Sequence, residues 1–186
     1  MTPVQPRKGN LLLAQPNIML DDVFARTVIL LSRHNEDGTV GFTMNKPTDY
    51  TLSDFVDGIT VVHSVYDGGP LEQDSLYFVH RVPDLIERST PISDGLYWGG
   101  DFDSVQSHLN AGRISQDDIR FFLGYSGWEY SQLDQEIYED TWLVIENKDA
   151  EALLRTAPMT HWKMQMRNLG GEFSLWSNAP VNPVLN

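Results

Sequence analysis

The stretch RTVILLSRHNEDGTVGFTMNKP, residues 26–47, decides the fold. Residues 26–34 are rich in β-branched and other apolar side chains, which is typical of a central strand. The Asp37-Gly38 pair supplies a tight turn, and residues 40–46 return as the second strand of a hairpin that Pro47 ends. A β-hairpin near the start of the chain favours a sheet with antiparallel pairing.

The rest of the chain mixes strands and helices without a regular alternation, and most helices fall in its second half. This pattern predicts an α+β fold with a largely antiparallel or mixed sheet, not a doubly wound parallel sheet. The chain is expected to form one domain over residues 1–186, with a loosely held tail at residues 177–186. Further strands are expected at residues 10–14, 61–70, 75–81, 94–101, 118–128 and 141–146, and helical segments at residues 21–25, 51–59, 101–112, 131–140, 147–157 and 161–171.

The chain is strongly acidic, with a formal net charge of −13. The excess is concentrated between Asp84 and Glu151, where 15 acidic residues face 4 basic ones. Because affinity for nucleic acid comes mainly from Lys and Arg side chains that neutralise phosphates, direct DNA binding is disfavoured. No segment approaches the ~20 apolar residues of a membrane span, and the first apolar run is too short for a signal peptide. A cytoplasmic protein without membrane contact is therefore expected.

The GYSGW segment, residues 124–128, is similar to the nucleophile elbow of serine hydrolases, in which a serine follows a strand. That motif needs a glycine two residues after the serine, where this chain has Trp128. The helix that should start at once is also delayed. The favoured interpretation is a glycine turn at the end of a strand, and no catalytic residue is assigned.

The sequence contains no motif that is typical of a metal or cofactor site. There are no cysteines, and the five histidines show neither an i, i+4 pair nor an HxH pair. The glycine pairs Gly68-Gly69 and Gly99-Gly100 are not followed by GK[ST] and do not fit GxGxxG. We therefore expect no metal and no cofactor. The two pairs act either as tight turns or as anion-binding concavities after strands.

A group of polar residues at one end of the hairpin stands out against the acidic background. In an antiparallel hairpin, the start of one strand lies beside the end of the other, so Arg26 and Lys46 are expected at the same sheet end with Asn45 between them. Such a corner suits a carboxylate or phosphate ligand. The alternative is ion pairing with nearby aspartates. Aromatic residues at element ends, Tyr125 and Trp128 among them, either line a pocket or pack in the core.

Taken together, several motifs resemble those of the AlgH/YqgE family of small bacterial proteins. They are GNLLLAQPNIMLDDVFARTVILLSRHNEDGTVGFTMNKP, YDGGP, WGGD and FLGYSGWEYSQLDQEI followed by TWLV. The resemblance runs from about residue 9 to about residue 176. It implies an α+β fold whose strongly bent sheet curls into a barrel-like core with helices outside. It also implies a cytosolic protein of unresolved biochemical function, often described as a transcriptional regulator by association with alginate regulation.

The family pattern resembles GYAGWxxGQLxxE, and two positions of this chain depart from it. Ser126 stands where alanine is usual, which weakens the hydrolase interpretation, and Ser131 stands where glycine is usual, which affects the local turn. The matching positions of this segment include Tyr125, Trp128, Gln132 and Glu136.

The first hypothesis is a cytosolic binding or regulatory module whose partner is a small anionic ligand or another protein. The second is an enzyme of unknown reaction with Glu136, His34 or His80 as general base. The third is a direct DNA-binding regulator, which the charge disfavours. The predicted ligand-binding residues are Arg26, Asn45, Lys46, Gly68, Gly69, Gly99, Gly100, Tyr125, Trp128, Gln132 and Glu136.

Overall fold

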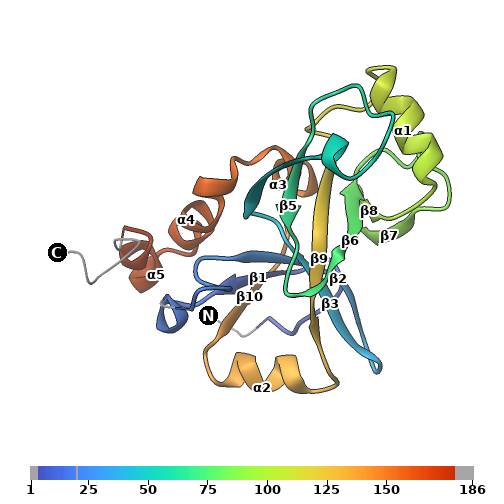
Figure 1. Ribbon diagram of the computed structural model, residues 1–186. Helices are drawn as coiled ribbons and strands as arrows, with labels where there is room; N and C mark the ends of the chain where they lie inside the picture. The colour runs from blue at the N-terminus through green and yellow to red at the C-terminus, as the bar shows by residue number, and fades with distance from the viewer. Residues whose placement is uncertain (1–3, 20, 179–186) are drawn as a thin grey trace.

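The hairpin predicted at residues 26–47 is present in the computed structural model, which describes residues 4–19 and 21–178 (Figure 1). Strand β2 (Val28–Asn35) pairs antiparallel with β3 (Gly38–Thr43), with a bulge between Leu31 and Arg33. The apolar residues at the start of β2 are fully buried, as expected for a central strand. The second strand ends at Thr43, before the predicted end at Pro47, and Pro47 instead begins a further strand, β4 (Pro47–Thr51), that the sequence did not predict.

A ten-stranded sheet is the centre of the molecule, in the order β10-β1-β2-β3-β9-β6-β8-β7, with β5 on β9 and β4 on β5. All pairings are antiparallel except that of β5 with β9, so the predicted mostly antiparallel α+β fold is confirmed. The order ends at β10 and β7, and no described pairing joins these two strands. The barrel-like core that the family resemblance implied is therefore not confirmed. The remaining strands are β1 (Leu11–Ala14), β5 (Ser64–Asp67), β6 (Leu71–His80), β7 (Thr90–Ser93), β8 (Leu96–Trp98), β9 (Ile119–Trp128) and β10 (Trp142–Ile145).

Helices cover both faces of this sheet, and most lie in the second half of the chain as predicted. They are α1 (Phe102–Asn110), α2 (Gln132–Tyr138), α3 (Ala150–Arg155), α4 (Pro158–Leu169) and α5 (Gly171–Trp176). The helix expected at residues 51–59 is only the short 3-10 turn η2 (Leu52–Asp54). In place of the helical turn expected at residues 21–25, residues 22–26 form hydrogen-bonded turns. A second 3-10 turn, η1 (Pro16–Ile18), follows β1. Of the tail predicted at residues 177–186, Ser177 and Asn178 form a turn after α5 in which Ser177 is buried, and the rest lies outside the described residues.

Strand β9 connects the two halves of the sheet. Its first half pairs with β5 and β6, and its last three residues pair with β3. Gly124 adopts a φ of +70° between the two halves, a conformation that favours glycine. The interpretation of residues 124–128 as a strand-ending turn is therefore wrong, because the strand bends at Gly124 and continues to Trp128.

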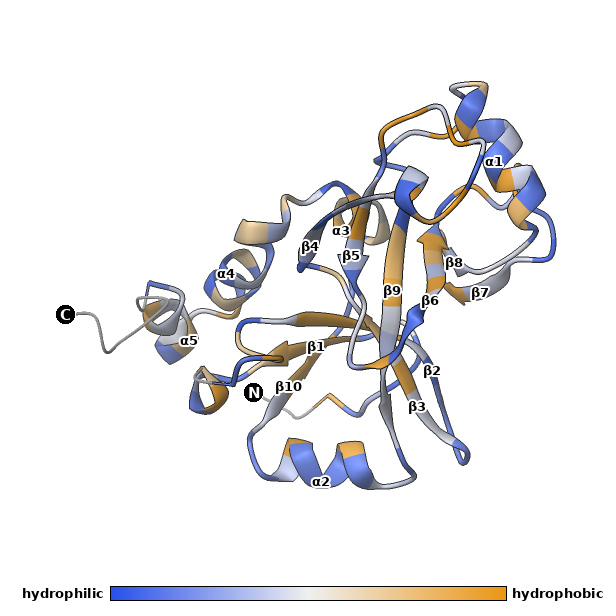
Figure 2. Cartoon of the chain, in the orientation of Figure 1, coloured by the Kyte–Doolittle hydropathy of each residue, from blue (hydrophilic) through white to orange (hydrophobic). Residues whose placement is uncertain are grey.

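Strands β1 and β10 lie between two layers of helices, as Figures 1 and 2 show. Leu11 and Leu13 face one side and pack with residues of α3 and α4, including Trp162. Leu12 faces the other side and packs with Leu133 of α2. Because every side chain of β1 is buried, this strand is continuously apolar, whereas a half-exposed strand would alternate. A third cluster joins α1 to β5, β6 and β9.

No helix within the described residues is both long enough and apolar enough to cross a membrane.

Candidate functional site

The structure brings Arg26, Asn45 and Lys46 together at one sheet end, but their polar groups are engaged within the protein. The Asn45 amide donates from Nδ2 to the carbonyl of Arg26 and accepts from the backbone N–H of Val28, both over 2.8 Å. Lys46 donates from Nζ to the carbonyl of Val23. The amide thus holds Arg26 at its positive φ of 55°, and burial lowers the pKa of Lys46.

Gly68 and Gly69 lie beside this corner, where they allow two backbones to approach closely. The Lys46 carbonyl accepts from the N–H of Asp67, and the Gly68 carbonyl accepts from the N–H of Thr43. A Cβ atom on Gly68 would lie 2.2 Å from the carbonyl oxygen of Gly124 in β9. The backbone of β9 therefore occupies the space next to these glycines in which an anion would have to bind.

The second glycine pair belongs to a different part of the fold. Gly99 donates to the carbonyl of Phe78, and its own carbonyl accepts from Nε2 of His80 over 3.2 Å. Gly100 lies against the backbone of Glu87. Tyr125 is also engaged elsewhere, since its hydroxyl donates to Glu72 over 3.4 Å.

Trp128, Gln132 and Glu136 form a hydrogen-bonded clamp together with Trp142, which is one of the aromatic residues at element ends but not one of the predicted ligand-binding residues. Glu136 Oε2 accepts from the indole N–H of Trp128 over 2.8 Å and from that of Trp142 over 2.7 Å. Its other oxygen accepts from Gln132 over 3.0 Å. The clamp joins β9, α2 and β10, and the carboxylate that was considered as a general base serves this structural role.

Ser131 begins α2 in the left-handed region, with a φ of 63° and no side-chain cap hydrogen bond. Glycine adopts this conformation without the steric cost that a Cβ atom brings. This explains why the family pattern has glycine at the position.

Ser126 is buried, and its hydroxyl has no hydrogen-bond partner among the described residues. No described histidine approaches it as a base would in a serine hydrolase. The serine packs against Gly69, where a Cβ atom would lie 2.4 Å from its Oγ.

We expect Ser126→Ala to leave the fold intact and to raise the free energy of unfolding by up to about 1 kcal/mol, because it removes a buried hydroxyl that lacks a partner. Urea denaturation measures the change. Ser32→Ala is the matched control: Ser32 is also buried but donates to the Val40 carbonyl over 3.2 Å, so this change should cost about 1 kcal/mol. Equal losses from both variants would contradict the prediction.

The two candidate histidine bases are engaged separately. His34 bonds through Nδ1 to the Thr39 hydroxyl over 2.7 Å, and the buried His80 contacts Gly99. No described hydrogen bond joins either to a second acid or base. In the described part of the chain, no cluster of three or more histidine and acidic side chains is arranged to hold a metal ion.

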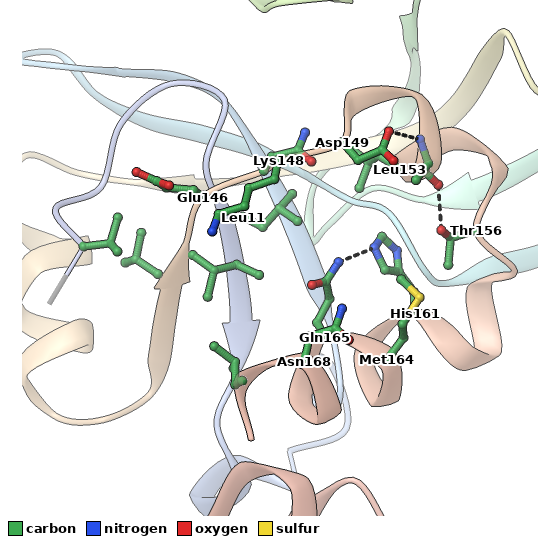
Figure 3. Close-up of a pocket in the computed structure, with 16 residues that line it drawn as sticks. Leu11, Glu146, Lys148, Asp149, Leu153, Thr156, His161, Met164, Gln165 and Asn168 are labelled. Carbon is green, nitrogen blue, oxygen red and sulfur yellow. Dashed lines mark hydrogen bonds between the residues drawn. The ribbon is translucent and has the colours of Figure 1, made fainter. Parts of the chain in front are cut away.

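A pocket that the sequence did not predict lies where β10, α3 and α4 meet, on the other side of β1 from α2 (Figure 3). Its volume is about 480 Å³, within the range of small-molecule sites. Leu11, Ile145 and Leu153, which pack together on this face of the sheet, contribute the apolar part of the lining. The polar lining residues are Glu146, Asn147, Lys148, Asp149, Thr156, His161, Gln165 and Asn168.

Two buried nitrogens in the lining residues have no hydrogen-bond partner among the described residues: Asn147 Nδ2 and His161 Nδ1. Gln165 Nε2 approaches His161 Nε2 at 3.5 Å, as Figure 3 shows. When Gln165 donates, Nε2 is the acceptor and the proton of the neutral ring is on Nδ1. Burial and the nearby Arg120 guanidinium lower the pKa of His161 to about 4, so the ring is neutral at pH 7. The wall therefore contains two unused donors.

Local sequence patterns do not predict this pocket, because most of its lining residues come from three elements that are adjacent only in the folded chain. Asn147 and Lys148 follow a strand, whereas His161 and Gln165 lie one turn apart on α4. The available signal was the run of polar residues at 146–149 directly after a buried strand, a position at which binding groups often occur.

We expect stability to fall as the pH drops from 7 toward 4, because His80 and His161 are buried and each has a pKa of about 4. A histidine in the unfolded chain has a pKa near 6.5, so between pH 6.5 and pH 4 the unfolded state binds protons that the folded state does not bind. Proton binding therefore favours the unfolded state in this range. Each shift corresponds to about 3 kcal/mol. Urea denaturation between pH 7.5 and pH 4 measures the loss, and His161→Phe should reduce its slope. A flat profile in the wild-type protein would contradict the prediction.

The fold places this chain among small α+β proteins with an open ten-stranded sheet. At the end of the sheet formed by β1 and β10, helices cover both faces, and a pocket of small-molecule size lies there. The chain belongs to the AlgH-like family, whose model matches residues 11–174.

The chain is similar to other proteins over nearly its whole length. A protein of Chlorobium limicola named "UPF0301 protein" is 38% identical over 97% of this chain and 96% of its own length. One of Bacteroides thetaiotaomicron with the same name is 37% identical, covering 98% and 93%. Among solved structures, the AlgH protein from Pseudomonas aeruginosa is 28% identical, with a TM-score of 0.72, covering 97% and 98%. Protein DIP2367 from Corynebacterium diphtheriae, at 23% identity and a TM-score of 0.78 over 96% and 95%, shares the fold.

Proposed function

We propose that this protein is a cytoplasmic regulatory module without catalytic activity, which binds a small organic molecule between β10, α3 and α4. The pocket with two unused buried donors, Asn147 Nδ2 and His161 Nδ1, carries this proposal. A buried donor without an acceptor is unfavourable by about 1–3 kcal/mol. A ligand that supplies acceptor oxygens would remove that cost on binding.

The lining indicates what kind of molecule fits. Leu11, Ile145 and Leu153 suit an apolar body. The amide of Asn147 and the exposed ammonium group of Lys148 suit an oxygen-rich head such as a carboxylate. Two acidic residues, Glu146 and Asp149, also line the pocket, and the Asp149 carboxylate is engaged as the N-cap of α3 through the Ala152 N–H. We therefore place the small anionic ligand expected from the sequence in this pocket. The Arg26, Asn45 and Lys46 corner is a weaker candidate, since both polar atoms of the Asn45 amide already bond to backbone groups and Lys46 already bonds to a backbone carbonyl.

Any effect on transcription would pass through a partner protein. The net charge of −13 opposes contact with DNA phosphates. The enzyme alternative has less support, because Glu136, His34 and His80 are each bonded to a different group and none of them lines this pocket.

A thermal-shift screen of small carboxylates and other metabolites at pH 7 tests the proposal. A ligand at saturation should raise Tm by about 5 °C, and Asn147→Ala or Lys148→Ala should abolish the shift. Lys163→Ala is the matched control, because Lys163 lies on α4 but does not line the pocket. Absence of any hit, or hits lost only in Arg26→Ala and Lys46→Ala, would overturn the assignment.

A further inference from the structure

The outer edge of β10 has backbone groups without partners in the described structure. Strand β10 is the last strand of the sheet and pairs only with β1. Gln15 donates to the Thr141 carbonyl over 3.0 Å, and in an antiparallel pair the bonded positions alternate. Leu143 and Ile145 therefore bond inward to β1, and Trp142 and Val144 direct their N–H and C=O groups outward.

Among the described residues, this short edge strand has none of the charged or proline side chains that hinder pairing. The strand is Trp142–Ile145, four apolar residues without proline, lysine or any other charge. Val4 lies nearby, but the described backbone hydrogen bonds of residues 4–10 go to Arg7 and Leu31, not to β10. The edge is therefore available for strand addition, in which an extended peptide bonds to the free backbone groups.

A groove of about 800 Å³ runs along this edge, and helices on the two faces of the sheet form its walls. Ile137 and Tyr138 of α2 line one side, and Phe173 and Trp176 of α5 line the other. In Figure 1 the edge of β10 lies between these two helices. The side chains of an added strand would point alternately toward α2 and toward α5.

The charge of the groove indicates which peptide it fits. Its charged lining residues among those described are Glu139, Asp140 and Glu172, all acidic. Tyr138 and Trp176 are 83% and 43% exposed beside them, and aromatic faces attract lysine and arginine side chains. A second copy of this chain would bring the same acidic groups against themselves, so self-pairing is disfavoured.

We propose that the outer edge of β10 is a docking site for an extended, lysine- or arginine-bearing segment of another protein, which adds to the sheet as a further strand. Backbone bonds to Trp142 and Val144 hold the segment, and the acidic and aromatic walls select its basic side chains. The site is separate from the ligand pocket in its chemistry, although Val4 and Val144 line both.

Fluorescence anisotropy with a labelled peptide of alternating valine and lysine tests the docking site. Val144→Pro removes one outward N–H while the inward bonds remain, and should weaken binding about tenfold. Val144→Thr keeps the N–H and a similar shape, and should bind like the wild type. The same peptide with N-methylated backbone, tested on the wild-type protein, should also bind about tenfold more weakly, and needs no variant to fold.

Three results would overturn the proposal. The first is equal affinity for the N-methylated peptide. The second is equal affinity for a peptide with glutamate in place of lysine, since the acidic walls should reject it. The third is a dimer in analytical ultracentrifugation that Val144→Pro abolishes, which would show that a second copy of the chain occupies the edge.

Discussion

Gly68→Ala should lower the free energy of unfolding by at least about 3 kcal/mol, enough to remove much of the stability of an ordinary domain. The added Cβ would lie 2.2 Å from the Gly124 carbonyl oxygen and 2.9 Å from the Cβ of Phe122. Because the first contact is with backbone, no side-chain rotation relieves it. Urea denaturation, or the soluble yield if the variant unfolds, measures the effect.

Gly99→Ala is the control for this prediction. Gly99, unlike Gly68, has a positive φ, of 62°, but a Cβ atom there meets nothing within 4 Å. Gly99→Ala should lower the free energy of unfolding by about 1 kcal/mol, which is the cost of placing alanine in the left-handed conformation. Similar losses for the two variants would contradict the conclusion that Gly68 is required for the close approach of the loop to β9.

Glu136→Ala should lower the free energy of unfolding by about 2–5 kcal/mol, because the indole N–H groups of Trp128 and Trp142 then lose their acceptor. Both tryptophans are buried, at 6% and 1% exposure, so water cannot readily replace the carboxylate. Glu136→Gln retains an acceptor oxygen and should cost much less. Tryptophan fluorescence during urea denaturation measures both variants.

Glu139→Ala is the matched control on the next turn of the chain. The Glu139 side chain is exposed, and its carboxylate accepts only from Gln135 in the described part of the structure, so its loss should change stability by about 0.5 kcal/mol or less. If Glu136→Ala were no more harmful than Glu139→Ala, the clamp would have no structural importance.

Local sequence patterns were sufficient to predict most of the fold. The run of apolar residues from Val28 with the turn at Gly38 predicted the first hairpin, because hydrophobic periodicity and turn chemistry act over short distances. The short strands β4 and β7 were missed, since Pro47 and Pro91 are unfavourable in central strands and these strands pair at the margins of the sheet. The openness of the sheet depends on long-range pairings that no local pattern encodes.

For the site, the sequence correctly placed Arg26, Asn45 and Lys46 side by side, because hairpin geometry determines which strand ends meet. It could not show that the oxygen and the nitrogen of the Asn45 amide each bond to a backbone group, 17 and 19 residues away. Likewise, Glu136 was recognisable as a motif position, but its second indole partner, Trp142, comes from the following strand. The pocket itself depends on His161 lying beside residues 146–149, a tertiary contact without a sequence signature.

Native mass spectrometry of the protein purified from its own cells tests the ligand pocket most directly. The expected result is a bound small molecule in the wild type that is also retained in Lys163→Ala and Lys46→Ala but lost in Asn147→Ala and Lys148→Ala. A bound molecule that persists in the two pocket variants, or that disappears with Lys46→Ala, would contradict binding between β10, α3 and α4.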